Sequence, residues 1–234
     1  NIEEITVPFT GESATTKTYF GYIFGATAYD KQYINLPLEL RTVNLAEGAT
    51  KVPDYAFYNC ENIENFNLPS TITSISYYAF NGCDKLTEFT IPDNLTSLGS
   101  DVFTNSGLTR VNASSIDKVF AVGGSPFGSG ADLYIKGKLV TEVTIPTGYT
   151  TINRALSYCN SVTKVTIPDG VKTIGDSAFY RCSSLTEVVI PDSVTSIGQY
   201  AFYRCSSLTE VVIPDGVTSI GNSAFYDCSG LTEI

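Results

Sequence analysis

The sequence predicts an α/β repeat solenoid, a fold in which short and nearly identical units stack along one axis. Self-similarity is the first reason: residues 185–207 read LTEVVIPDSVTSIGQYAFYRCSS, and residues 208–230 read LTEVVIPDGVTSIGNSAFYDCSG. Cysteine spacing is the second, because an interval of 23 residues recurs in two series, Cys60 and Cys83, then Cys159, Cys182, Cys205 and Cys228. A fixed period of about 20 to 50 residues is typical of solenoids.

Superposing the units predicts a single solenoid over residues 1–234, with about ten units of which the last is a stub. Their strands start at Ile2, Leu40, Ile63, Leu86, Leu108, Val140, Val162, Leu185, Leu208 and Leu231. Two longer intervals indicate insertions near residues 9–39 and 113–139. The first is rich in Tyr and Phe, which predicts a packed excursion, whereas the GGSPFGSG run of the second predicts a surface loop. Neither end shows the polar cap of a terminal repeat, so we expect a fragment of a larger protein.

The unit at residues 185–207 illustrates the local structure that we expect. It predicts a short strand with Val188 and Ile190 facing inward and Glu187 and Val189 facing outward. A Pro-Asp pair ends the strand, because proline donates no hydrogen bond to a neighbouring strand. After an apolar return across the core, the AFYRC tail places Phe and Cys on one face of a single helical turn.

Stacking predicts a continuous buried column at each inward position, because no unit covers its own apolar face. One column holds Phe57, Phe80, Phe103, Leu156, Phe179, Phe202 and Phe225. An aliphatic column holds Val52, Ile75, Leu98, Ile152, Ile174, Ile197 and Ile220, and a narrow one holds Ala56, Ala79, Val102, Ala155, Ala178, Ala201 and Ala224. Ser76, Asn153 and Pro53 share a position with Gly175, Gly198 and Gly221, so we interpret these glycines as sites of close packing.

Composition excludes several functional classes. With 43% hydrophobic residues over 234 positions, the chain can bury a sizeable core. The formal net charge of −10 opposes binding to nucleic acid or to anionic lipid. Histidine is absent, which excludes Ser-His-Asp catalysis and His-ligated zinc. The longest apolar runs are too short to cross a bilayer, so we expect no direct membrane insertion.

The six cysteines are expected to be free and buried. Ordinary counting in an extracellular chain would suggest three disulfides. Each Cys, however, shares a face with a core Phe, and identical side chains in successive units point the same way, which opposes disulfide geometry. A zinc site would need C-x-x-C spacing, and the sequence contains none.

On the outward face of the strands, successive repeats place equivalent residues in rows. Glu187, Glu210 and Glu233 form an acidic row beside the exposed pair Val189 and Val212. A binding face for a basic or polyhydroxyl partner is one interpretation, and a solvated face whose charges deter aggregation is the other. The candidate partner-binding residues are Glu142, Thr144, Lys164, Thr166, Glu187, Val189, Glu210 and Val212.

Other surface patterns have simpler explanations. The row Asp93, Asp169, Asp192 and Asp215 could bind calcium, but turn formation explains it without a metal. Outward Tyr and Arg side chains could form an aromatic and cationic stripe for sugars or proteins, although rings and stems that simply cover the surface are the interpretation we favour. These residues are Tyr58, Tyr180, Tyr203, Tyr226, Arg181 and Arg204.

The sequence contains partial matches to catalytic motifs, but each lacks the other motifs that its enzyme class needs. Residues 115–118 match S-x-x-K without the companion motifs of that enzyme class, and the glycine-rich run at 124–130 lacks the G-K-[ST] ending of a phosphate loop. Repeated surface carboxylates also lack the enclosed site that raises the pKa of a catalytic acid. We therefore expect no enzyme activity and no cofactor.

The unit L-T-E-V-x-I-P-D-x-V-x-x-I-G-x-x-A-F-Y-x-C-S-S resembles the BspA-like leucine-rich repeat over most of the chain. Residues 132–140, DLYIKGKLV, also resemble a connector found between such repeats. Departures are Leu156 for Phe, Ser106 for Cys and the degenerate segment 113–139. The resemblance implies a right-handed leucine-rich repeat solenoid with a parallel sheet on its concave face, in a secreted or surface-attached protein of bacteria or protists.

The expected function is non-catalytic recognition or adhesion at the cell surface or in the secreted state, with a host or neighbouring-cell protein or glycan as partner. An architectural spacer and an accessory module of a carbohydrate-active enzyme remain alternatives. The open ends also favour end-to-end self-association of the fragment.

Overall fold

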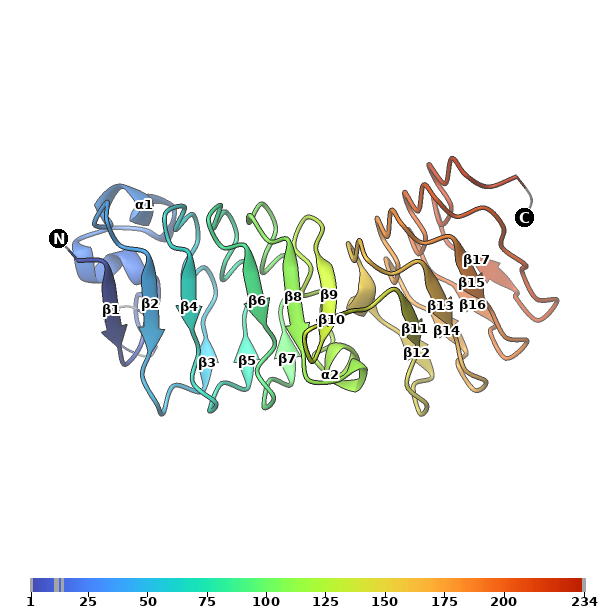
Figure 1. Cartoon of the computed structure of the whole chain (residues 1–234), viewed down its shortest axis with the longest axis horizontal. Helices are drawn as coiled ribbons and strands as arrows, with labels where there is room; N and C mark the ends of the chain where they lie inside the picture. The colour runs from blue at the N-terminus through green and yellow to red at the C-terminus, as the bar shows by residue number, and fades with distance from the viewer. Residues whose placement is uncertain (1, 11–12, 14, 233–234) are drawn as a thin grey trace. The chain divides into compact units, whose positions relative to one another are not determined.

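The computed structural model describes residues 2–10, 13 and 15–232 in two compact units, Asn1–Arg110 (unit 1) and Val111–Ile234 (unit 2). Each unit is a stack of repeats that supply short parallel strands and few helices (Figure 1). The expected repeat solenoid of parallel strands is therefore confirmed.

Unit 1 carries two rows of strands, one before and one after the proline turn of each repeat. In the first row a sheet has the order β1 (Glu4–Val7), β2 (Thr42–Leu45), β4 (Asn65–Asn67), and β6 (Glu88–Thr90) follows in a separate sheet. The second row is the sheet β3 (Lys51–Val52), β5 (Ser74–Ile75), β7 (Ser97–Leu98). Equivalent residues pair, as Asn44 does with Asn67, so each strand-face position forms a column.

The insertion at 9–39 is a packed excursion, as the sequence predicts. It contains η1 (Phe20–Phe24), η2 (Tyr29–Lys31) and α1 (Gln32–Asn35). Phe20 is fully buried with its ring centroid 5.4 Å from that of Phe57, and its N–H donates to the carbonyl of Ala56. The buried Gln32 joins the insertion to the repeats, accepting from Gly21 N–H and donating to the carbonyl of Tyr55. The insertion therefore covers the start of the Phe column, a cover that the sequence does not predict.

Unit 2 repeats the two-row arrangement. Its first row is the sheet β11 (Glu142–Thr144), β13 (Lys164–Thr166), β15 (Glu187–Val189), and its second row is β12 (Thr151–Ile152), β14 (Thr173–Ile174), β16 (Ser196–Ile197), β17 (Ser219–Ile220). The 3-10 helix η3 (Arg154–Leu156) follows β12. The expected strand at 210–212 is absent: a single bridge joins Glu210 to Glu187. Two like charges face each other at this bridge, which disfavours closer pairing.

The prediction of a surface loop within 113–139 is wrong. β8 (Arg110–Ala113) leads into α2 (Ile116–Ala121), and β9 (Asp132–Ile135) forms an antiparallel hairpin with β10 (Lys138–Leu139). Phe127 in the glycine-rich run is fully buried, and its carbonyl accepts from Gly130 N–H as Phe57 does from Cys60 N–H. Gly124 and Pro126 are buried with it, whereas Gly123 and Ser129 are exposed, because the Phe and Pro supply apolar surface that the glycine count conceals.

The prediction of single helical turns holds only for η3, and is wrong for the AFYRC segments, which are stacked tight turns. Tyr200 and Arg204 adopt positive φ angles of 58° and 59°, outside the right-handed helical region. Phe202 N–H donates to Ala224 of the next repeat at 2.8 Å, and Arg204 N–H donates to Tyr226 at 2.8 Å. A helix would use these donors internally, so the turn geometry lets every second N–H join one repeat to the next.

The predicted core columns are largely confirmed. Phe57, Phe80, Phe103, Leu156, Phe179 and Phe202 are all buried, and stacked rings such as Phe80 and Phe103 lie 5.4 Å apart. In the last repeat Phe225 is half-buried and Ile220 is 50% exposed, because the described residues hold no full repeat beyond them. Ile190, predicted to face inward, is also half-buried.

The glycines after the second-row strands confirm close packing. A Cβ built on Gly198 would lie 2.6 Å from the backbone nitrogen of Asp176, and one on Gly175 would lie 2.6 Å from the carbonyl oxygen of Ile152. Gly221 is tighter still, at 2.4 Å from the nitrogen of Gln199. The backbones of adjacent repeats thus touch where these side chains are missing.

Candidate functional site

The strand face of unit 2 brings the sequence-predicted site residues together. The parallel register aligns Glu142, Lys164 and Glu187 in one column. A second column aligns Thr144, Thr166 and Val189. Glu210 continues the first column through its bridge, and Val212 is 68% exposed beyond it. The structure therefore places all eight residues on one outward surface.

An ion pair divides the charged column. Lys164 Nζ lies 2.7 Å from Glu187 Oε1, with both side chains about half-exposed. The hydrogen bond to Glu187, together with its negative charge, raises the pKa of Lys164 above the ordinary lysine value, and Glu142 contributes in the same direction. Lys164 thus offsets the repulsion expected along the acidic row. Glu233, the predicted end of that row, lies outside the described residues.

A shallow groove of about 610 Å³ lies along the C-terminal part of this face. Its lining combines carboxylates, hydroxyls and exposed valines: Thr186, Glu187, Val188, Val189, Ile190, Thr209, Glu210 and Val212. Val189 is 46% exposed, although an apolar side chain gains free energy when buried. The groove therefore offers a partner apolar contact beside two acidic groups.

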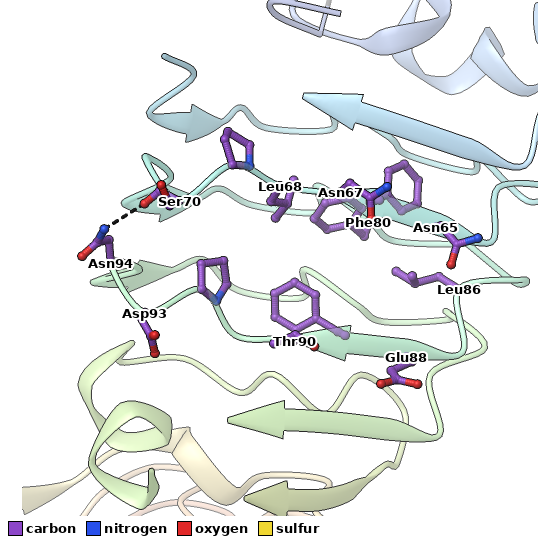
Figure 2. A pocket seen from close by; sticks show the side chains of 14 residues that line it. Asn65, Asn67, Leu68, Ser70, Phe80, Leu86, Glu88, Thr90, Asp93 and Asn94 are labelled. Atoms are coloured by element: carbon purple, nitrogen blue, oxygen red, sulfur yellow. Dashed lines mark hydrogen bonds between the residues drawn. The ribbon is translucent and has the colours of Figure 1, made fainter. Parts of the chain in front are cut away.

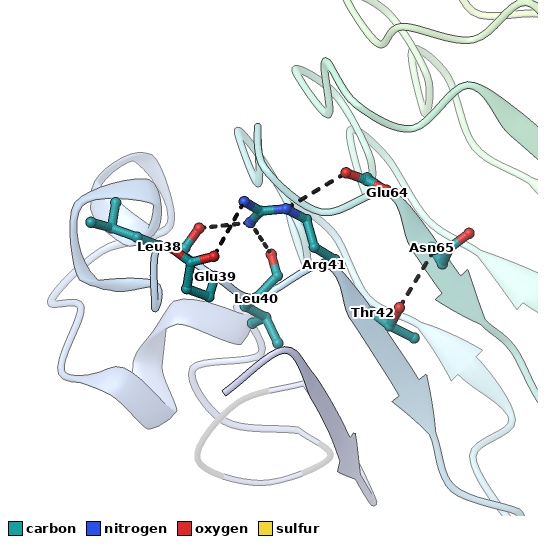
Figure 3. A network of polar contacts seen from close by, with 7 residues as sticks. All are labelled: Leu38, Glu39, Leu40, Arg41, Thr42, Glu64 and Asn65. Atoms are coloured by element: carbon teal, nitrogen blue, oxygen red, sulfur yellow. Dashed lines mark hydrogen bonds and ion pairs between the residues drawn. The ribbon is translucent and has the colours of Figure 1, made fainter. Parts of the chain in front are cut away.

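The strand face of unit 1 is polar and bonded within itself. Asn44 donates to Glu4 Oε1 at 2.7 Å, and Asn67 donates to Asn44 Oδ1 at 2.6 Å. At the start of β2, Arg41 joins several groups (Figure 3): its guanidinium donates to the carbonyl of Leu38 at 2.6 Å and lies 3.6 Å from Glu64. This network ties the end of the insertion at 9–39 to the first repeats.

A second groove, of about 570 Å³, lies in unit 1 between β4 and β6 (Figure 2). The described residues that line it are Asn65, Phe66, Asn67, Leu68, Pro69, Ser70, Phe80, Leu86, Glu88, Phe89, Thr90, Pro92, Asp93 and Asn94. Sequence reasoning missed this groove. A signal was present, since Phe66 and Phe89 hold an inward strand position that is Val in six other repeats.

The aromatic stripe of unit 2 is a stack of rings. Tyr180 and Tyr203 lie 4.9 Å apart, and Tyr203 and Tyr226 lie 5.1 Å apart. Arg181 sits near the Tyr180 ring, and Arg204 pairs with Asp227 at 3.1 Å. These contacts between repeats agree with a stripe that covers the surface, as we favoured from the sequence.

The cysteines are all free and buried, as predicted. The thiol of Cys205 donates to the carbonyl of Phe179 in the preceding repeat at 3.1 Å, and Cys83, Cys182 and Cys228 make the equivalent bond. Burial raises the pKa of Cys159 to about 11 and raises that of the other five thiols. These thiols hold repeats together and are poor nucleophiles at neutral pH.

The metal and catalytic alternatives find little support in the described part of the chain. The four turn aspartates are exposed, and no group of three or more Cys, Asp or Glu side chains there is placed to hold a metal ion. Ser115 caps α2, its hydroxyl accepting from Lys118 N–H at 3.3 Å, which explains the S-x-x-K match. No helix among the described residues has the length and apolar character needed to span a membrane.

A model of the BspA type leucine rich repeat region matches residues 35–127 and 131–234, in six copies. The chain belongs to the BspA-type leucine-rich repeat family. No curated protein matches it.

Solved structures of leucine-rich repeat proteins resemble this BspA-type chain. A leucine rich cell surface protein of Faecalibacterium prausnitzii is 25% identical with a TM-score of 0.59, over 88% of this chain and 62% of that one. The pneumococcal vaccine antigen PcpA is 24% identical with a TM-score of 0.56, over 78% of this chain and 47% of its own. A leucine-rich repeat protein of Eubacterium ventriosum has the same fold. It is 21% identical with a TM-score of 0.50, over 89% of this chain and 76% of that one. The chain thus spans about half to two thirds of the first two proteins.

Proposed function

We propose that the chain is a non-catalytic recognition module of a secreted or cell-surface protein, with adhesion to a protein or glycan as its role. Family membership and the likeness to a cell-surface protein support the location. The leucine-rich repeat family also supports a right-handed solenoid with the strand face on its concave side. The module needs no cofactor for this role.

The observation that carries the proposal is the exposed apolar pair Val189 and Val212 beside Glu187 and Glu210. A partner with an apolar contact flanked by basic groups would bury the valines and face the carboxylates. Paired strands hold β11, β13 and β15 in place, so little conformational entropy is lost when a partner binds.

The test is adhesion of beads coated with the chain to a monolayer of cultured epithelial cells. The double variant Val189→Lys and Val212→Lys should lose most of the adhesion, because it removes the apolar contact and offsets the two negative charges of Glu187 and Glu210. A matched control, Gln199→Lys and Asn222→Lys, adds the same two charges to exposed positions of the same repeats outside the strand face. Equal adhesion of the two variants would refute the strand face as the site.

An architectural spacer is the second candidate, because within each unit the stacked repeats hold one another in place without any ligand. In that case wild-type beads would adhere no better than beads coated with albumin. An accessory module of a carbohydrate-active enzyme remains the third, and it would require a catalytic domain in the same protein.

A further inference from the structure

The groove of unit 1 exists because the first-row sheet is interrupted. In the described residues β4 is the last strand of its sheet, and no backbone hydrogen bond joins it to β6. In unit 2 the equivalent ladder continues through β11, β13 and β15, with Ile145 N–H donating to the Thr166 carbonyl at 3.0 Å, and ends at the single bridge to Glu210. The interruption is local, because β5 and β7 of the same repeats remain paired through Ser74 and Ser97.

Two phenylalanines explain the interruption. Phe66 packs 4.6 Å from Phe57 and 4.8 Å from Phe80, and Phe89 packs 4.5 Å from Phe103, between ring centroids. Valine holds this inward position in β2 and throughout unit 2. Two benzyl groups in consecutive repeats, about 4.8 Å apart in an ordinary sheet, need more room than two isopropyl groups, so the strands separate above them.

The groove is closed at its ends and lined by two kinds of surface. At the turn end, Asn94 donates across the groove to the carbonyl of Ser70 at 2.8 Å, as Figure 2 shows. At the other end, Lys85 N–H donates to the backbone carbonyl of Glu61. Its floor is aromatic, with Phe66 half-buried and Phe89 only 7% exposed. Amide, hydroxyl and carboxylate groups stand along the rim.

The rim groups suit a neutral ligand that carries hydroxyls. Asn65 and Asn67 direct their amide nitrogens to β2, at Thr42 and Asn44, which leaves their oxygens as the acceptors for a ligand. Glu88, held 3.7 Å from Arg110, and Asp93 add carboxylate acceptors. The described lining includes no Lys or Arg, which disfavours phosphates and other anions.

From these observations we propose that the β4–β6 groove is a binding site for a neutral oligosaccharide. The C–H faces of a sugar ring would lie over the aromatic floor, whose ring faces are electronegative, while its hydroxyls donate to the rim. A volume of about 570 Å³ is within the usual range for small-ligand sites, about 300 to 1,000 Å³. An inserted peptide strand fits less well, because the paired β5 and β7 keep these repeats one strand apart.

The proposal concerns unit 1 and does not depend on the strand face of unit 2. Four trisaccharides serve as probes at millimolar concentration, in saturation-transfer NMR with the whole chain: maltotriose, cellotriose, mannotriose and triacetylchitotriose. We expect at least one to receive saturation and to give a measurable Kd. If none does, the proposal is overturned, and tighter binding of a neutral extended decapeptide would overturn it in favour of an inserted strand.

Two matched pairs of variants locate the site. Asn67→Ala with Asp93→Ala should weaken binding by about tenfold or more, through loss of two acceptors. Asn222→Ala with Asp215→Ala makes the same changes at exposed positions of unit 2 that line neither groove, and should leave the Kd unchanged. Thr90→Lys, which puts a long side chain on the exposed rim, should also abolish binding, whereas Thr147→Lys, at an exposed turn position that lines neither groove, should not. Equal effects of a variant and its control would overturn the assignment.

Discussion

Single side chains in this molecule derive their roles from the repeat before and the repeat after. The cysteines show this most clearly. Four of the six thiols, those of Cys83, Cys182, Cys205 and Cys228, donate to a carbonyl of the preceding repeat. Ser106, which replaces Cys in one repeat, donates instead within its own repeat, to the carbonyl of Phe103 at 2.7 Å.

Burial of the thiols predicts how stability depends on pH. A group whose pKa is raised on folding stabilises the folded state fully below its unfolded pKa, and that stabilisation is lost as the pH rises toward the folded pKa. For Cys159 the window runs from about 9 to about 11, and its share is at most about 2 to 3 kcal/mol. Denaturant unfolding from pH 8 to 11 should show a falling free energy, with a smaller fall in Cys159→Ala. An identical fall in both proteins would contradict the assignment.

Free thiols also predict a titration result. Protein denatured without reductant should react with close to six equivalents of a thiol reagent, because all six cysteines are unpaired. The native protein should react far more slowly at pH 8, since burial keeps the thiols protonated. A count near zero in the denatured protein would mean that disulfides are present.

The Phe column carries more stability than the Tyr stripe. Phe202 is fully buried between Phe179 and Phe225, so Phe202→Ala should cost roughly 3 to 5 kcal/mol through lost burial and a cavity that rigid repeats cannot close. Tyr203 is partly exposed, and Tyr203→Ala should cost within about 1 kcal/mol. Urea unfolding measures both, and equal losses would show that the inward face is assigned wrongly.

At the scale of elements, contact between consecutive backbones decides the spacing of the repeats. The stacked turns and the glycines after the second-row strands act together here. Positive φ at Tyr200 and Arg204 directs alternate N–H groups to the next repeat. Absence of a Cβ at Gly198 lets the chain approach Gly175 and Asp176.

Gly198→Ala tests this contact. The new Cβ would lie 2.6 Å from backbone atoms, which cannot rotate away, so we expect a loss of about 1 to 3 kcal/mol from overpacking. Gly216→Ala is the control, because its Cβ would meet its nearest atom at 3.1 Å and should cost less. The measurement is thermal or urea unfolding. A loss in the control as large as that in Gly198→Ala would refute close packing as the cause.

At the scale of the whole molecule, the net charge of −10 sets which partners can approach. The chain should not bind double-stranded DNA or vesicles rich in phosphatidylserine at about 0.15 M salt, because its long-range field repels both. Gel-shift and vesicle-flotation assays check this. Binding that weakens steeply with added salt would reveal a local basic surface and contradict the prediction.

The sequence by itself determined the period, the repeat family and most of the buried columns, because a 23-residue repeat forces equivalent residues into the same environment. It also placed the outward columns of unit 2 correctly, since side chains alternate along a strand. These features depend only on the local sequence pattern of one repeat and on its repetition along the solenoid axis.

Tertiary structure decided what depends on contacts between non-equivalent residues. Phe127 in the glycine-rich run is buried, and the insertion at 9–39 covers Phe57, because apolar groups far apart in sequence meet there. The AFYRC segments are turns because their donors bond across repeats. The β4–β6 groove arises where Phe66 and Phe89 follow one another, and only the packed volume of neighbouring repeats shows that two adjacent large rings separate the strands above them.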